Sequence, residues 1–212
     1  SNKVFPDGRG CLEQILWESR VHIVRLIASG ETTLDPMHML ALYLYTANAT
    51  VFTQVNTTLS NYTERSVWSP FIVCLYQAVD ILPPLVNEVY RGVECAFEPD
   101  LYTVGTQITW NTFGVASKDW RSPSELIKEK LGIIFIIKSK TGKNISRYSC
   151  SPVDSEVLFL PGTTFTVTAL YRADVITLGQ ANIRASTYAA RDVDIRKAAE
   201  GASSIIVEIT EC

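Results

Sequence analysis

The sequence predicts an α+β fold, with helices first and then a largely antiparallel sheet or pair of sheets. Two observations predict it. Apolar residues recur at intervals of three and four through residues 1–85. Short runs rich in β-branched and aromatic residues then follow through residues 86–212. We expect a single domain of 212 residues, with a helical part and a β-rich core that meet near residue 85.

The helical part carries start and stop signals. Residues 11–29 show helical apolar spacing. Asp35-Pro36 supplies an N-cap residue and a proline at the first helical position, ahead of one long apolar helix expected over 37–56. Ser69-Pro70 repeats this signal, and Pro83-Pro84 ends the helix that follows.

The β-rich core reads as short strands separated by turns. They are expected at 86–93, 105–110, 112–117, 132–138, 156–161, 164–172 and 203–210. Ser122-Pro123-Ser124-Glu125 is a capping box, which predicts one helix among the strands. A second helical piece is expected near 189–200.

Composition excludes several classes of protein. Hydrophobic residues make up 47% and charged residues 19%, which describes a globular chain. A net charge of −3 gives no basic field that would recruit nucleic acid. No apolar run reaches the length of about 18 residues that a membrane-spanning helix needs, so no transmembrane segment is expected.

The cysteines and histidines argue against a metal site. Five cysteines occur without a CxxC pair, and the two histidines both fall in predicted helices, so zinc binding and histidine-based triads are not expected. Cys11 and Cys212 bracket the chain and could be joined in an oxidising compartment. Four N-x-[ST] triplets hint at secretion, so a secreted and a cytoplasmic protein are equally expected.

Two carboxylates stand directly ahead of an apolar run in SPVDSEVLFLPGTTF, residues 151–165. Side chains two apart in a strand face the same side, so Asp154 and Glu156 are expected to project into one cleft. The alternative is a solvated strand end with surface acids.

Two further stretches are candidates for ligand contacts. Arg91 near the end of a strand could hold a phosphate, and Gly92 would let a flat ligand approach the backbone. The alternative is an arginine paired with a core carboxylate. In residues 109–120, Phe113 and Trp120 could form a wall for an aromatic ring, although the stretch could also be an ordinary hairpin.

The order of these stretches resembles a known family. VYRGV, then a strand ending in F-x-x-x-S, then DSEVLFLPGTTF resembles the arginine–serine–glutamate class of mono-ADP-ribosyltransferases. LYLYT and WSPF in the helical part are similar to the eukaryotic branch of that family. The resemblance extends over roughly residues 35–170, and it implies helices packed on a two-sheet, ADP-ribosyltransferase-like β core.

The resemblance implies NAD⁺ as the substrate and a protein as the acceptor of ADP-ribose. Glu156 matches the catalytic glutamate and would stabilise the positive sugar in the transition state. Arg91 matches the arginine that would grip the diphosphate, Gly92 would bind the nicotinamide amide, and Tyr45 is a further candidate contact with NAD⁺. Arg91 and Glu156 are therefore expected to line one hollow.

Two positions depart from the family pattern, and they bear on the acceptor and on the activity expected here. Asp154 matches the position that faces the acceptor; a glutamate there goes with transfer to arginine, and the aspartate is one methylene shorter. Val115 replaces a serine that orients the catalytic glutamate, while Ser117 keeps the last serine position. An NAD⁺ glycohydrolase on the same site and a catalytically silent binding module are the alternatives to an ADP-ribosyltransferase.

Overall fold

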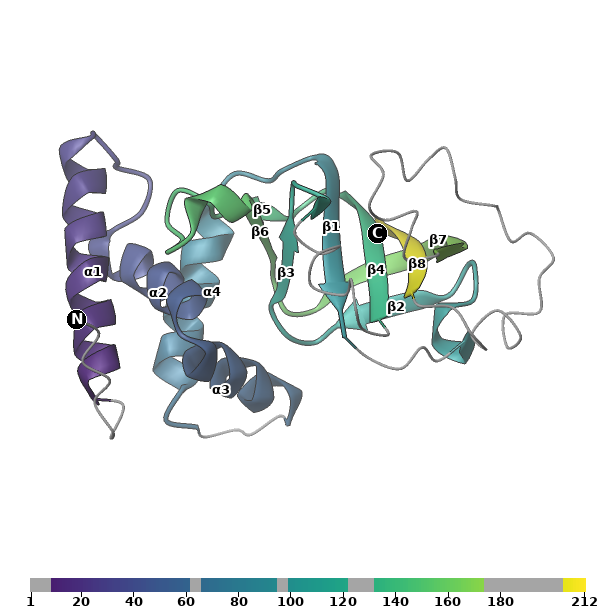
Figure 1. The fold of residues 1–212 in the computed structure, drawn as a ribbon, viewed down its shortest axis with the longest axis horizontal. Helices are drawn as coiled ribbons and strands as arrows, with labels where there is room; N and C mark the ends of the chain where they lie inside the picture. Colours follow the sequence, from purple (N-terminus) through teal and green to yellow (C-terminus); the bar gives the residue numbers. More distant parts are fainter. Residues whose placement is uncertain (1–8, 62–65, 95–98, 122–131, 174–203) are drawn as a thin grey trace. The chain divides into compact units, whose positions relative to one another are not determined.

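The computed structural model describes residues 9–61, 66–94, 99–121, 132–173 and 204–212 (Figure 1). The chain divides into two compact units. The helical unit comprises residues 1–83 and 143–153, and the β unit comprises residues 84–142 and 154–212. Residues 143–153 return from the β-rich part of the sequence to the helical unit. The single domain expected from the sequence stays a prediction.

The helical unit begins with four helices among the described residues, α1 Arg9–Ala28, α2 Pro36–Ala47, α3 Ala49–Ser60 and α4 Ser69–Ile81. Asp35 caps α2 as predicted, because its side chain accepts hydrogen bonds from Met37 N and His38 N. Helix α4 begins at Ser69, next to the predicted signal, but its N-cap is Trp68 with no side-chain cap, so the N-cap role expected for Ser69 is wrong.

The single long helix expected over 37–56 is wrong. Asn48 interrupts it with an extended backbone, at φ −130° and ψ 109°. Its Oδ1 accepts from Thr50 N at 2.9 Å and from Val51 N at 3.1 Å, which caps α3. Asparagine competes for backbone donors in this way, so a continuous apolar pattern was divided into two helices by one polar side chain.

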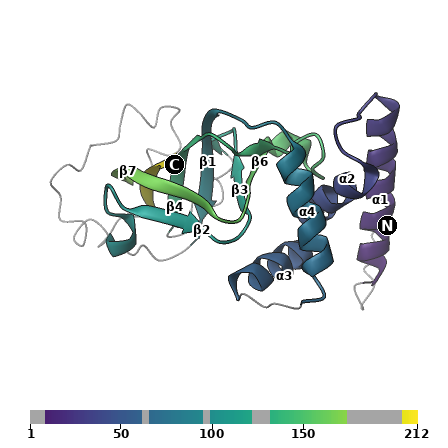
Figure 2. The ribbon, with the colours of Figure 1, turned by 180° about the vertical axis from the view of Figure 1, so that it is seen from behind.

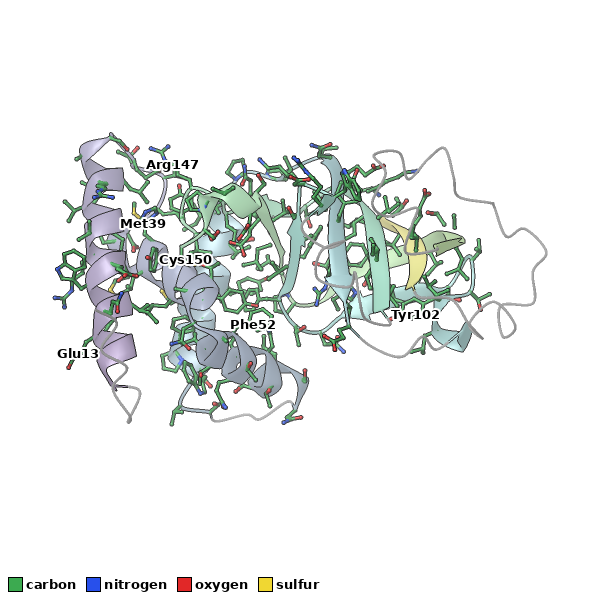
Figure 3. All side chains as sticks on the ribbon, viewed as in Figure 1. Glu13, Met39, Phe52, Tyr102, Arg147 and Cys150 are labelled. Atoms are coloured by element: carbon green, nitrogen blue, oxygen red, sulfur yellow. The ribbon has the colours of Figure 1, made fainter. Side chains whose placement is uncertain are left out.

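The core of the helical unit is apolar and includes the returning segment. Met39, Leu42 and Leu75 are almost completely buried, and so are Ile145 and Tyr148 from residues 143–153. Figure 3 shows the side chains of Met39 and Arg147 in this unit. These contacts explain why a segment from late in the sequence belongs to the helical unit.

The strands of the β unit lie in the order β2-β7-β8-β4-β1-β3-β6. Their bounds are β1 Asn87–Val93, β2 Gln107–Trp110, β3 Gly114–Ser117, β4 Gly132–Ser139, β6 Glu156–Phe159, β7 Thr163–Ala173 and β8 Ser204–Glu211. Only β4 and β8 pair in parallel among these described strands. Figure 2 shows β2 beside β7 from behind. All seven expected strands are confirmed, with ends that shift by no more than two residues. The short strand β5, Lys143–Asn144, lies in the helical unit and was not expected.

The seven described strands of the β unit form one sheet, so the expected division into two sheets is not confirmed. Strand β1 lies between β4, which continues to β8, β7 and β2, and β3, which continues to β6. It pairs with β4 from Asn87 to Val93, and it meets β3 at Tyr90, which is opposite Ser117. The mostly antiparallel α+β architecture is confirmed.

One face of the sheet carries the core of the β unit. Val89, Ala116, Phe135, Phe159 and Phe165 belong to this cluster and are nearly completely buried. Alternation along each strand places these residues on a common side. The helices expected after residue 122 and near 189–200 lie outside the described residues.

Membrane-spanning helices, metal sites and disulfides can be assessed only for the described residues. Within the described ranges, no helix is both long and apolar enough to cross a membrane. Among the same residues, no three histidine, cysteine or acidic side chains gather where they could hold a metal ion. Cys74, Cys150 and Cys212 form no disulfide within the described residues. The side chains of Cys11 and Cys95 lie outside the described residues.

Candidate active site

The end of β3 is hydrogen-bonded to the turn that carries the two candidate acids. Ser117 pairs with Glu156 in the register of β3 and β6. The Ser117 hydroxyl donates to the main-chain oxygen of Asp154 at 2.6 Å and accepts from Asp119 N at 3.0 Å. Lys118 N donates to the main-chain oxygen of Ser155 at 3.1 Å. The turn and the strand end therefore form one bonded structure.

The local structure of the two acids differs from the expectation. Strand β6 begins at Glu156, and Asp154 ends the short 3₁₀ helix η2, Pro152–Asp154. Ser155 between them has φ 51°, in the left-handed region. The two acids are therefore not successive same-side residues of a strand, and that argument for a shared cleft is wrong. Asp154 is exposed and Glu156 is half-buried; whether both line one cleft stays a prediction.

Arg91 lies against an aromatic ring. Its guanidinium carbon is 4.5 Å from the centroid of the Trp110 ring, which is a cation–π contact. The indole in turn packs nearly perpendicular to Phe159 at 5.7 Å between ring centroids and contacts Phe165 at 4.5 Å. The half-buried guanidinium is therefore supported by the aromatic part of the core.

Gly114 makes room for this contact. A Cβ added at Gly114 would overlap the six-membered ring of Trp110 and would lie 3.0 Å from Nη1 of Arg91. Any side chain at residue 114 would therefore displace the indole from beneath the guanidinium. This glycine is required for close approach, and not for an unusual backbone angle.

The register of β1 determines which side of the sheet Arg91 faces. Arg91 is opposite Phe135 of the core cluster, and it shares the core side with Val89 by alternation. Tyr90, Ser117 and Glu156 form the adjacent row. Neighbouring rows leave a sheet on opposite faces. The register therefore does not bring Arg91 and Glu156 together, and a common hollow between them stays a prediction.

Two predicted NAD⁺ contacts are buried. Phe113 and Tyr45 are each 1% exposed. The Tyr45 hydroxyl accepts a hydrogen bond from Asn56 Nδ2 at 2.9 Å, and its ring packs on Phe52 at 5.2 Å between centroids. Neither ring presents a surface to a ligand without movement of what covers it. Trp120 is half-buried, and Gly92 lies in β1 beside Arg91.

Sequence reasoning missed Trp110, Gly114 and the Asp119–Arg121 pair. Arg121 donates to Asp119 from its side chain and main chain, and these hydrogen bonds hold the pKa of the Asp119 carboxyl below its ordinary value. Trp110 and Gly114 both lie in the stretch that was singled out for its aromatic residues. One signal could have revealed Trp110. A guanidinium on the core side of a strand needs a partner, and an aromatic ring face can serve as one.

The family model described as NAD:arginine ADP-ribosyltransferase matches residues 12–184. The chain belongs to this family. It is thus a member of the mono-ADP-ribosyltransferases, enzymes that use NAD⁺ to modify proteins, and the resemblance seen in the sequence is confirmed. A search of curated proteins found no match.

Solved structures share the fold. The type III effector XopAI from Xanthomonas axonopodis pv. citri has a TM-score of 0.61 and 18% identity, over 100% of this chain and 81% of that chain. Vis from Vibrio splendidus, solved in complex with agmatine, has a TM-score of 0.60 and 15% identity, over 94% and 85%. The eukaryotic mono-ADP-ribosyltransferase ART2.2 has a TM-score of 0.60 and 19% identity, over 97% and 81%. A variant of ART2.2 was solved with NADH. At these identities the likeness concerns the fold alone.

Proposed function

We propose that this chain cleaves NAD⁺ at the bond between ribose and nicotinamide and transfers ADP-ribose to an arginine side chain of a protein. The observation that carries the proposal is the family match over residues 12–184, which includes Arg91, Ser117 and Glu156. The bonded turn around Glu156 supports it, because a catalytic carboxylate must be held in one place.

Glu156 stabilises the charge that develops on the ribose. Nicotinamide leaves with the bonding electrons, so positive charge appears on the sugar as in glycoside cleavage. A carboxylate about 4 Å from that charge contributes about 4 kcal/mol at an effective dielectric constant near 20. This corresponds to about three decades in rate. One carboxylate at the reacting carbon is therefore sufficient for substantial catalysis.

Arg91 and Gly92 bind the parts of NAD⁺ on either side of the nicotinamide ribose, which are the diphosphate and the nicotinamide. A guanidinium pairs with diphosphate oxygens through charge-assisted hydrogen bonds. Contact with the Trp110 ring supports this role, because it restricts the guanidinium before the ligand arrives. The backbone of Gly92 would hydrogen-bond the nicotinamide amide, with the half-buried Trp120 as a neighbouring ring.

Asp154 receives the acceptor. Its carboxylate is exposed at the end of η2, where it can pair with an incoming guanidinium. Agmatine, which carries the guanidinium of arginine, is bound by the structural neighbour Vis. Arginine is for these reasons the first acceptor to test, although the aspartate reaches one methylene less than a glutamate would.

A silent binding module is the second candidate, and one observation favours it. Val115 offers no hydroxyl, and the hydroxyl proton of Ser117 is directed to the Asp154 main chain. Neither of the two serine positions of the family pattern therefore orients the carboxylate of Glu156. Water as acceptor would instead make the chain an NAD⁺ glycohydrolase with the same residues.

The experiment incubates the purified chain with NAD⁺, with and without agmatine, and follows nicotinamide and ADP-ribosyl-agmatine by mass spectrometry. The proposal predicts nicotinamide release that rises with agmatine, together with the labelled product. Nicotinamide without product indicates a glycohydrolase. No nicotinamide under either condition indicates the silent module and overturns the proposed activity.

A further inference from the structure

Ser155 connects the two acids in a conformation that a serine seldom adopts. Its φ of 51° lies in the left-handed region, where a side chain other than glycine is disfavoured. Such a conformation persists when the surrounding structure holds it. The orientation of Asp154 relative to Glu156 therefore depends on whatever fixes the backbone of Ser155.

The end of β3 holds both peptide groups that flank Ser155. The Ser117 hydroxyl donates to the oxygen of the peptide that precedes Ser155, at 2.6 Å. Lys118 N donates to the oxygen of the peptide that follows Ser155, at 3.1 Å. The planes of these two peptides define φ and ψ of the residue between them. The two hydrogen bonds together therefore fix the conformation of Ser155.

The Ser117 hydroxyl is itself held in this direction. Ser117 is 6% exposed, and its oxygen accepts from Asp119 N at 3.0 Å. A hydroxyl has one proton to donate, and here that proton goes to the Asp154 oxygen. Arg121 in turn pairs with the Asp119 carboxylate at 3.0 Å, which stabilises the loop that supplies the Asp119 N–H. The Ser117 hydroxyl thus joins the Asp119 N–H to the main-chain oxygen of Asp154.

We propose that Ser117 is a positioning residue that sets the direction of Asp154 relative to Glu156, and that it thereby governs the partition of ADP-ribose between an arginine acceptor and water. The inference rests on the proposed function and deepens it. Ser117 acts through the backbone of Asp154 and Ser155 and does not touch the substrate. Loss of its hydroxyl would free Ser155 to leave the left-handed region and would move the acceptor carboxylate.

The test compares Ser117→Ala with Ser139→Ala. Ser139 is a matched control, because its buried hydroxyl also donates to a main-chain oxygen, that of Leu85 at 2.9 Å, and accepts an N–H, that of Gly142 at 3.2 Å. We expect Ser117→Ala to lower the ratio of agmatine transfer to NAD⁺ hydrolysis about tenfold, the scale of one lost hydrogen bond, and to raise KM for agmatine. The ratio should not change in Ser139→Ala. Ser117→Thr, which keeps the hydroxyl, should restore most of the ratio.

A second variant and a second measurement separate the possible failures. Lys118 is exposed, and Lys118→Pro removes the other hydrogen bond to the turn without altering Ser117. It should shift the ratio in the same direction, and it serves if Ser117→Ala does not fold. A ratio that stays at the wild-type value in both variants overturns the positioning role while the proposed function stands.

Amide hydrogen exchange tests the same contact without any activity. The amide of Lys118, which donates to the Ser155 oxygen, should exchange faster in Ser117→Ala than in the wild type and in Ser139→Ala. Faster exchange in a chain that does not cleave NAD⁺ supports the positioning of the turn and rejects the proposed function alone. Unchanged exchange overturns the inference whether or not NAD⁺ is cleaved.

Discussion

The guanidinium of Arg91 lies over the indole ring of Trp110, with 4.5 Å between its carbon and the ring centroid. Strands β1 and β2, which are not neighbours in the sheet, supply the two side chains, and Gly114 on β3 leaves the space that the pair occupies. The candidate diphosphate-binding arginine is therefore supported by the aromatic core of the β unit. This relationship gives the first two predictions.

Trp110→Leu should weaken NAD⁺ binding, because Arg91 loses the ring that restrains it. A cation–π contact contributes about 0.5–2 kcal/mol, so Kd should rise by about twofold to thirtyfold. Trp110→Phe should have a smaller effect, since a phenyl face is a weaker partner. Isothermal titration with NAD⁺ provides the measurement. Trp68→Leu is the control, because Trp68 also packs against an aromatic ring, that of Phe71, but in the helical unit. Equal Kd values for wild type and Trp110→Leu would rule out this support.

Gly114→Ala should destabilise the β unit by about 1–3 kcal/mol, because the added methyl overlaps the Trp110 ring. Chemical denaturation measures the loss. If overlap is the cause, the double variant Gly114→Ala/Trp110→Ala should lose less free energy of unfolding than the sum of the losses in the two single variants. Simple additivity of the two substitutions would show that the two residues do not compete for space.

The stability of the helical unit should depend on the charge of Glu31. Hydrogen bonds from Thr33 lower the pKa of the buried Glu31 carboxyl below its ordinary value of 4.5, against the effect of burial, and Arg147 at 2.9 Å adds to the lowering. A lowered pKa in the folded state means that this stabilisation is complete above the ordinary pKa and is lost as pH falls through the folded value.

Glu31→Gln should therefore destabilise the chain at pH 7, and the difference from wild type should shrink as pH falls below the ordinary pKa of 4.5 and through the lower pKa of the folded state. Urea denaturation at several pH values measures this difference. Glu13→Gln on α1 is the control, because Glu13 is exposed. A difference between Glu31→Gln and wild type that stays constant from pH 7 to acid would contradict the stabilising role of the Glu31 charge.

Glu211 should be essential to the turn after β4. Its carboxylate is 3% exposed and accepts hydrogen bonds from Lys140 N, from Thr141 N at 2.8 Å and from the Thr141 hydroxyl. Glu211→Ala leaves these donors unpaired, at a cost of about 1–3 kcal/mol for each buried one. The free energy of unfolding should fall by several times more than in Glu208→Ala, a half-buried acid on the same strand. Equal losses in the two variants would contradict this account.

The elements of the fold were predictable because their signals are local. Caps such as Asp35, and alternating β-branched residues, act within a few positions of the chain. The break at Asn48 was missed because apolar residues continue on both sides of one polar cap. The strands form one sheet because Tyr90 pairs with Ser117. No local sequence pattern predicts this pairing, because it joins two separate segments of the chain.

The sequence nominates residues for the candidate site, but it does not predict their geometry. The resemblance identified Arg91, Ser117 and Glu156, and the family match includes all three. The left-handed Ser155 was not predictable, because no glycine marks it and the hydrogen bonds that hold it come from β3. The partner of Arg91 was missed for a similar reason, since Trp110 reaches it through tertiary packing.

Nicotinamide release by wild type and by Glu156→Gln, at saturating NAD⁺, tests the central claim most directly. The glutamine keeps the size of the side chain and removes the negative charge that would stabilise the ribose. The account predicts release by the wild-type chain and a rate lower by about three decades in the variant. A variant that releases nicotinamide at the wild-type rate would contradict the assignment of Glu156, and with it the proposed mechanism.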